Sequence, residues 1–325
     1  MENKEILLKV VHPVHVSDAN GRIPAGFWRI KNGKVTVLDL DKLAEKYSLK
    51  QLRDLFSQAF RGYSPFSDND YTVPPNAPSV SGTRPRGDII FFIRDGNGNV
   101  YLPGSSIKGC IRTAIIGAAI ENNVGALQNL LSYVYSGRYD KKHGFSKWYQ
   151  RTVGSPHADP FRALSVGDAG TSVTTELLET LRVSTGRTIP SGYHEYAVDG
   201  EFLVRIGFDS GLWDDLARGT FLDNLQISSI DDILRIWTEW NAKVLQWVSQ
   251  HYDGLGVVFP RGDKLVFVGR NAGWATKTVG YLLRDQPRPG LFGHGRRAQC
   301  WPLPCTVPAA VRSGQKFFPG ALELV

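Results

Sequence analysis

The chain has few of the residues that build disulfide frameworks, since its 325 residues include only three cysteines. An odd number of cysteines in a chain of this size does not form the disulfide scaffold of a small secreted domain. No apolar run approaches the roughly 20 residues of a membrane span, and the opening Met1–Glu5 is polar and mixed in charge. These features predict a cytoplasmic protein without a signal peptide and without a membrane contact.

Metal ligands are also scarce. His294, Cys300 and Cys305 could donate to a metal ion, but their spacing matches no usual zinc pattern and a fourth ligand is missing. Cys110 falls on the apolar stripe of a helical pattern, where it is expected to be a small core residue. The sequence therefore predicts no metal site and no cofactor.

The chain has no large excess of charge of one sign, since its net charge is +7. Its basic and acidic residues are nevertheless unevenly distributed along the sequence. Residues 261–325 carry ten basic and three acidic residues, whereas residues 209–253 carry three basic and eight acidic ones. A basic end beside an acidic segment suggests one surface for a polyanion and another for a protein neighbour. The alternative is that both are solvated surface, and for the acidic segment this alternative is preferred.

Alternating and helical patterns follow one another along the chain. The segment 31–34 (Lys-Asn-Gly-Lys) is a strong hairpin signal. Residues 62–87 are rich in Pro, Ser, Gly and Asn and are expected to form a long mobile loop, and residues 137–160 an exposed basic loop or insertion. Strands are expected at 6–16, 27–30, 35–38, 88–93, 159–168, 178–183, 201–208 and 264–269, and helices at 39–60 and 229–252. The order strand–turn–strand–helix before residue 120 indicates an α+β fold rather than a doubly wound sheet.

The most informative segment is Tyr101–Arg112, which leads from a strand pattern into an apolar-periodic helix. Its apolar residues repeat at three- and four-residue steps, so they form one buried stripe. Ser105, Lys108 and Arg112 share the opposite edge, and Ser105 or Ser106 is expected to cap the first turn. A helix N-terminus with free amides and two cations would be an anion site. An ordinary capped core helix with solvated cations is an equally good interpretation.

This segment is not a Walker A loop, because Lys108 precedes Gly109 and Cys110 instead of following a glycine and preceding Ser or Thr. Its Pro-Gly-Ser-Ser-Ile-Lys-Gly-Cys-Ile-Arg run resembles the signature of the RAMP proteins, the RNA-binding subunits of type III CRISPR effector complexes. Further segments resemble that family in the expected order, above all the fifth subunit of the Csm (type III-A) complex: 12–16, 35–41, 159–168, 193–196, 273–278 and 319–324.

The resemblance implies one or two RNA-recognition-motif-like (ferredoxin-like) domains with long loop insertions. We expect an N-terminal domain at residues 1–170 and a C-terminal domain with a Gly/Arg-rich tail at residues 171–325. The resemblance further implies a non-catalytic subunit that caps the 3′-end side of the complex and is needed for CRISPR RNA maturation and assembly. The implied partners are CRISPR RNA and other Csm subunits, and host ribonucleases are left open as partners.

The resemblance and the charge pattern together give the candidate RNA contacts. Lys108 and Arg112, with the amides around Ser105 and Ser106, would contact phosphates, which positions RNA without reading its sequence. Closely spaced glycines near residues 290–297 would let amides approach phosphates beside two arginines, unless this tail is disordered. The candidate RNA-binding residues are Ser105, Ser106, Lys108, Gly109, Arg112, His15, Arg162, Lys277, Gly293, Gly295, Arg296 and Arg297.

The alternative is a RAMP endoribonuclease. A CRISPR RNA-processing enzyme would use a histidine as general acid or base, for which the candidates are His12, His15 and His294. A target-cutting subunit would use an aspartate, for which the candidates are Asp18, Asp68, Asp70 and Asp88. No histidine is placed beside a second catalytic group, and no aspartate spacing suggests metal binding. We therefore expect no catalytic residues.

Overall fold

The strands of the chain form one mixed sheet. A computed structural model describes residues 1–17, 21–61, 65–80, 85–136, 144–184, 187–269, 279–285 and 307–325. Across the main sheet the strand order is β11-β14-β13-β9-β10-β1-β15-β12. These strands are β1 (Glu2–Val10), β9 (Gly170–Ser184), β10 (Arg187–Phe208), β11 (Val257–Val258), β12 (Leu265–Phe267), β13 (Val307–Arg312), β14 (Gln315–Phe317) and β15 (Ala321–Leu324).

Both halves of the sequence contribute to this sheet. The first strand, β1, pairs antiparallel with β10 on one side and with the last strand, β15, on the other. The expected boundary between residues 170 and 171 coincides with the start of β9, which pairs along its length with β10. The predicted mixture of helices and strands is confirmed, with a large mixed sheet. The division into two RNA-recognition-motif-like domains stays a prediction.

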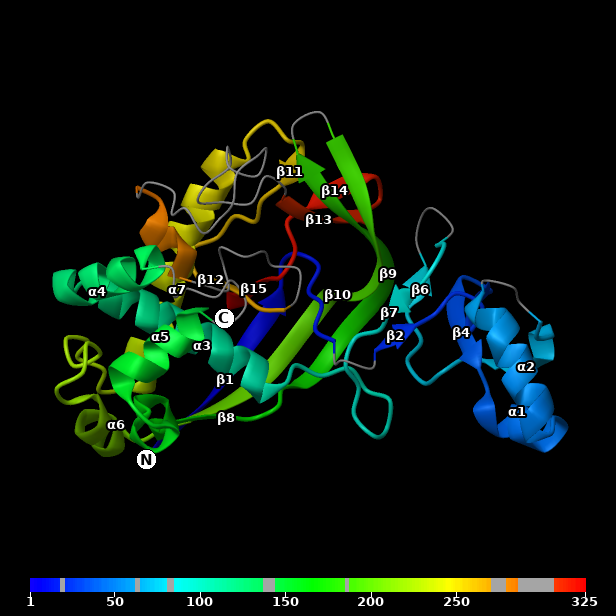
Figure 1. Ribbon diagram of the computed structural model, residues 1–325, viewed down its shortest axis with the longest axis horizontal. Helices are drawn as coiled ribbons and strands as arrows, with labels where there is room; N and C mark the ends of the chain where they lie inside the picture. The colour runs from blue at the N-terminus through cyan, green and yellow to red at the C-terminus, as the bar shows by residue number, and fades with distance from the viewer. Residues whose placement is uncertain are drawn as a thin grey trace.

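The helices α3 (Gly104–Glu121) and α7 (Ile230–His251) lie on one side of the main sheet (Figure 1). They touch where Gly117 of α3 faces the ring of Trp240, which leaves no room for a larger residue. The main hydrophobic core lies between these helices and the sheet. The helix predicted at 229–252 is confirmed, because its apolar face has a helical period. Further helices are α4 (Val124–Tyr135), α5 (Gly144–Val153), α6 (Ser210–Ala217) and the 3-10 turns η2 (Pro156–Ala158), η3 (Pro160–Ala163) and η5 (Val279–Leu283).

A small lobe stands away from the main sheet, at the blue end of the colour scale in Figure 1. It contains α1 (Leu40–Lys46), α2 (Leu49–Phe60), β3 (Trp28–Lys31), β4 (Lys34–Leu38) and β5 (Tyr71–Thr72), and it has its own apolar cluster. The single helix expected at 39–60 is wrong. The chain breaks at Tyr47, and Ser48 caps the second helix in a capping box with Gln51.

The predicted hairpin at 31–34 is confirmed, since Lys31 pairs with Lys34 and both intervening residues have positive φ. The loop expected at 62–87 instead contains η1 (Asp68–Asp70), β5 and β6 (Ser79–Val80) within its described part. Both β5 and β6 form because they pair with β4. The exposed loop expected at 137–160 is wrong from residue 144 onward, where α5 buries Trp148 and Tyr149. The other short strands are β2 (Arg22–Ile23), β7 (Ile89–Ile90) and β8 (Leu164–Val166).

Candidate nucleic-acid interface

Helix α3 begins with the Pro-Gly-Ser-Ser-Ile-Lys-Gly motif, but no serine caps it. Pro103 occupies the N-cap position, and the backbone N–H of Gly104 donates to Asp168 Oδ1 at 2.7 Å. A Cβ atom at Gly104 would lie 2.1 Å from the carbonyl oxygen of Val166, so only glycine fits this close approach. The expected cap at Ser105 or Ser106 is therefore wrong, and a carboxylate already lies at the first amide of the helix.

Lys108, one of the two expected phosphate contacts, is directed inward. Its Nζ donates to the carbonyl oxygen of Leu164 at 2.6 Å, and the side chain is half-buried. Burial lowers the pKa of Lys108 below its ordinary value, and the neighbouring Asp159 opposes this shift. Its ammonium group thus fixes the start of β8 against α3.

Arg112, the second expected contact, pairs with a carboxylate. Its Nη2 lies 2.9 Å from Asp159 Oδ2, and its guanidinium lies over the rings of Tyr149 (4.4 Å) and Phe161 (5.3 Å). The hydroxyl of Tyr149 donates to Asp159 Oδ1 at 2.9 Å, and burial raises the pKa of Tyr149. Lys108 and Arg112 together hold the segment 159–164 against α3.

The exposed part of the motif is what remains available to a ligand. Ser105 and Gly109 are exposed and Ser106 is half-buried. Apart from the adjoining residues and the backbone of α3 itself, no described atom lies within 4 Å of a Cβ built on Gly109. Arg162 is exposed on η3, in the segment that Lys108 and Arg112 hold, where it donates to the carbonyl oxygen of His157. We call Ser105, Ser106, Gly109 and Arg162 the α3 surface.

The histidines near the N-terminus lie in the interior. His15 is 1% exposed and its Nδ1 lies 2.6 Å from the carbonyl oxygen of Glu195. His12 is likewise buried, with Nδ1 2.9 Å from the carbonyl oxygen of Phe318, and burial lowers its pKa. The expectation that His15 contacts RNA does not fit this position, because no RNA group reaches a buried ring. Both rings instead tie the segment after β1 to backbone carbonyl groups far along the chain.

A buried polar cluster around His15 was not anticipated from the sequence. The rings of His15 and His194 lie 4.9 Å apart, and Thr180 Oγ1 bonds both His194 Nδ1 (2.8 Å) and the hydroxyl of Tyr196 (2.9 Å). The only sequence signal was the segment Tyr193–Tyr196, whose polar residues fall on β10. The cluster is enclosed between β9, β10 and the segment after β1.

Each described aspartate that was proposed for a target-cutting site pairs with a cationic side chain. Asp68 and Asp88 each pair with an arginine, Arg29 and Arg22 respectively. Asp70 pairs with Lys46 at 2.8 Å in the small lobe. Within the described ranges, no three His, Cys, Asp or Glu side chains are grouped so that they could hold a metal ion.

Several candidates lie outside the described residues: Asp18, Lys277, Gly293, His294, Gly295, Arg296, Arg297, Cys300 and Cys305. In the acidic segment, Asp209 caps α6, and Asp232 in the first turn of α7 accepts from the backbone amide of Ser228. Arg235 pairs with both Asp232 and Glu239. Much of that charge thus serves helix ends and local ion pairs. No helix of the described part is long and apolar enough to cross a membrane.

The sequence matches one protein family over most of its length. The profile of the RAMP superfamily matches residues 7–256. The CRISPR system Cms protein Csm5 of Streptococcus thermophilus is 36% identical over 113 residues, which span 34% of this chain and 29% of that protein. The Csm5 protein of Enterococcus italicus is 55% identical over 31 residues, or 10% of this chain and 9% of that protein. The matched parts thus span less than a third of either relative.

Two solved structures share the fold over nearly the whole chain. One is a chain of the Csm–crRNA–target RNA ternary complex of a type III-A CRISPR-Cas system, with a TM-score of 0.70 and 18% identity, covering 99% of this chain and 100% of that one. The other is the crystal structure of T. onnurineus Csm5, with a TM-score of 0.66 and 19% identity, covering 98% and 99%.

Proposed function

Because the chain belongs to the RAMP superfamily, we propose that it is a non-catalytic RNA-binding subunit of a type III-A (Csm) effector complex. The observation that carries the proposal is the α3 surface, where the family motif leaves Ser105 and Gly109 exposed. An exposed glycine inside a helix costs roughly 0.5–1 kcal/mol relative to alanine. Open space above Gly109 lets an RNA backbone approach the helix closely, which a side chain would prevent.

The role of the motif cations differs from the one expected from the sequence. Lys108 and Arg112 act through the segment they hold, so they position Arg162 and the helix start. In this proposal, direct phosphate contacts come from Arg162 on η3. Further contacts come from Lys277, Arg296 and Arg297, which are proposed from the sequence. Such contacts bind RNA in a salt-dependent manner and without sequence preference.

Membership of a Csm complex rests on the Csm5 relatives and on the shared fold. We further propose the finer role that the sequence resemblance implies: the chain caps the 3′-end side of the complex, is needed for CRISPR RNA maturation and assembly, and contacts neighbouring Csm subunits. Recruitment of host ribonucleases belongs to the same proposal. The burial of His12 and His15 and the ion pairs of Asp68, Asp70 and Asp88 favour this role over an endoribonuclease.

The test is a binding and cleavage assay with the purified full chain and end-labelled CRISPR RNA, in magnesium and in chelator. The proposal expects a shift that weakens steeply with salt, and RNA that stays intact under both conditions. Metal-independent cleavage would instead implicate a histidine, and metal-dependent cleavage an aspartate. Absence of binding both to the free chain and to a complex reconstituted with other Csm subunits would refute the RNA-binding role.

A further inference from the structure

The main sheet has a gap in its strand pairing along one edge of β9. At one end of the gap Ala169 bridges Leu102, and at the other end Glu176 pairs with Ser79 of β6. Between them, residues 170–175 pair with β10 on one side and with no strand of the described part on the other. The carbonyl oxygen of Thr175 accepts from Ser79 Oγ on the open side. Since successive residues alternate, Thr171 and Val173 direct their main-chain groups the same way.

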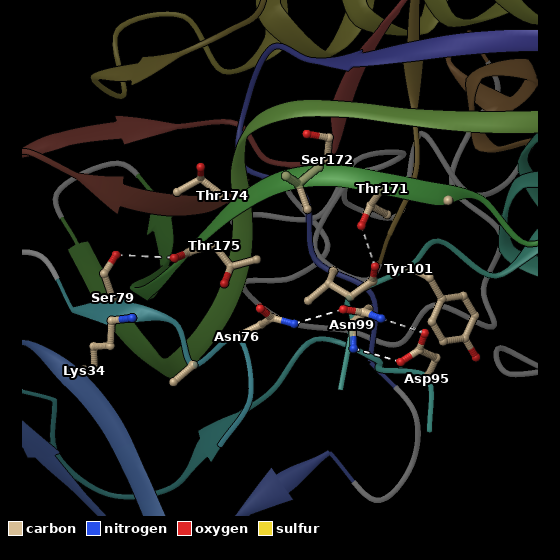
Figure 2. A pocket seen from close by; sticks show the side chains of 14 residues that line it. Lys34, Asn76, Ser79, Asp95, Asn99, Tyr101, Thr171, Ser172, Thr174 and Thr175 are labelled. Carbon is tan, nitrogen blue, oxygen red and sulfur yellow. Dashed lines mark hydrogen bonds between the residues drawn. The ribbon is translucent and has the colours of Figure 1, made fainter. Parts of the chain in front are cut away.

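A polar pocket of about 730 Å³ occupies this gap. Its walls come from four segments far apart in the sequence: the β3–β4 hairpin, the loop before β6, the turn at 95–101, and β9. Figure 2 shows Asn76 and Asn99 facing each other from two of these segments, with Tyr101 and Lys34 at opposite sides of the view. The volume lies in the range of sites that hold one small ligand.

The pocket wall is fixed by a buried ion pair. Arg94 lies 2.5 Å from Glu195, which is fully buried in β10, and also donates to the carbonyl oxygens of Asn76 and Gly98. Arg94 thereby ties the loop at 76 and the turn at 98 to the sheet. A site whose walls are held in this way loses little conformational freedom when a ligand binds.

The turn that forms one wall carries a carboxylate whose lone pairs are largely engaged. Asp95 accepts from the backbone amides of Asn97 and Asn99 and from the side chain of Asn99. The amide of Asn99 lowers the pKa of Asp95, so this group is ionised at neutral pH. Among the described residues of the lining, Lys34 is the one cation and Asp95 the one carboxylate. The rest of the lining offers hydroxyls, amides and main-chain groups, which donate and accept without net charge.

We propose that this pocket holds one unstacked nucleotide of a bound single-stranded RNA, a role that rests on the proposed function. The open strand edge and the hydroxyls of the lining present donors and acceptors to a base edge, and the ring of Tyr101 provides a stacking face. Lys34 lies where it can neutralise the phosphate of that nucleotide. An extended peptide would also pair with the strand edge, and the outcomes below separate it from a nucleotide.

The test uses short RNAs that carry a single 5-iodouridine, photocrosslinked to the full chain and mapped by mass spectrometry. Across a series of such RNAs with the label at successive positions, the RNA that places its label in the pocket gives a crosslink at Tyr101. The variant Lys34→Ala/Tyr101→Ala weakens RNA binding roughly 5- to 100-fold, as expected for loss of one stacked base, and Tyr101→Phe retains binding. The matched control Lys31→Ala/Tyr135→Ala removes one lysine and one tyrosine, both exposed outside the pocket, and leaves affinity unchanged.

The outcomes separate this site from RNA binding in general. If RNA binds the double variant as tightly as the original chain and crosslinks only outside the pocket, the pocket is not a nucleotide site. The proposed function as an RNA-binding subunit is unaffected by that result. Hydrogen exchange at 170–175 is slowed by RNA if the proposal holds. If other Csm subunits slow this exchange and RNA does not, the edge binds a protein strand, and the proposal that the pocket holds a nucleotide is refuted. A chain that binds no RNA, alone or in its complex, overturns both proposals.

Discussion

Arg112 and Asp159 form an ion pair that joins the family motif to a segment almost fifty residues later. Arg112 Nη2 lies 2.9 Å from Asp159 Oδ2, and the same guanidinium covers the ring of Tyr149. A motif cation that the sequence assigns to phosphate binding is thus engaged inside the protein. Replacing Arg112 should therefore lower folding stability, and it should remove no direct RNA contact.

Replacing this arginine tests that conclusion. We expect Arg112→Ala to lower the free energy of unfolding by about 1–2 kcal/mol, because a partly exposed ion pair and two ring contacts are lost. Urea denaturation measures the change, and a double-mutant cycle with Asp159→Asn isolates the coupling of the pair. The control Arg205→Ala breaks the more exposed pair with Glu5 and should change stability by less than about 0.5 kcal/mol. Equal effects of the two variants would contradict the assigned role.

The carboxylate cap of α3 gives a second prediction. Asp168→Ala removes the acceptor of the Gly104 amide and should cost about 0.5–2 kcal/mol of stability. Asp168→Asn keeps an oxygen acceptor at the same place and should retain most of that stability. Thermal unfolding of both variants measures the difference. Equal losses in both would mean that the charge of Asp168, and not its hydrogen bond, matters.

The contact between α3 and α7 gives a third prediction. A Cβ atom at Gly117 would lie 2.3 Å from the ring of Trp240. Gly117→Ala should therefore cost about 1–3 kcal/mol of stability through overpacking, although alanine is the better helix former. Denaturant unfolding would show this, and an increase in stability would mean that the two helices separate easily.

Burial of His12 gives a pH dependence. Burial lowers the pKa of His12 from its ordinary value of 6.5, so the folded protein binds a proton there less readily than the unfolded chain. The contribution of His12 to the free energy of unfolding is therefore fully present above pH 6.5. It is lost as the pH falls towards the lowered pKa, by at most about 1.4 kcal/mol per pH unit. His12→Asn should be less stable at pH 7 but should lose less on going to pH 5. A parallel loss in both proteins would contradict this.

The sequence predicts individual elements better than their partners. The helix after Pro103 was predictable because Ile107, Ile111 and Ile115 repeat at helical spacing and face the core. The break at Ser48 was readable from its capping box but was hidden by a continuous apolar pattern on both sides. The partners of Lys108 and Arg112 were not predictable, because Leu164 and Asp159 approach only when the sheet forms. The pocket beside β9 could not be predicted for the same reason, since four distant segments line it.

The most direct test of the central claim compares Gly109→Ala with the original chain, measuring RNA affinity and unfolding on the same preparation. A Cβ at this position meets no described atom outside its own helix, so the substitution should stabilise the protein by roughly 0.5–1 kcal/mol. If RNA lies against the α3 surface, the more stable protein binds RNA more weakly, and Gly109→Glu binds it more weakly still. Unchanged affinity in both variants would contradict the claim that RNA binds at this surface.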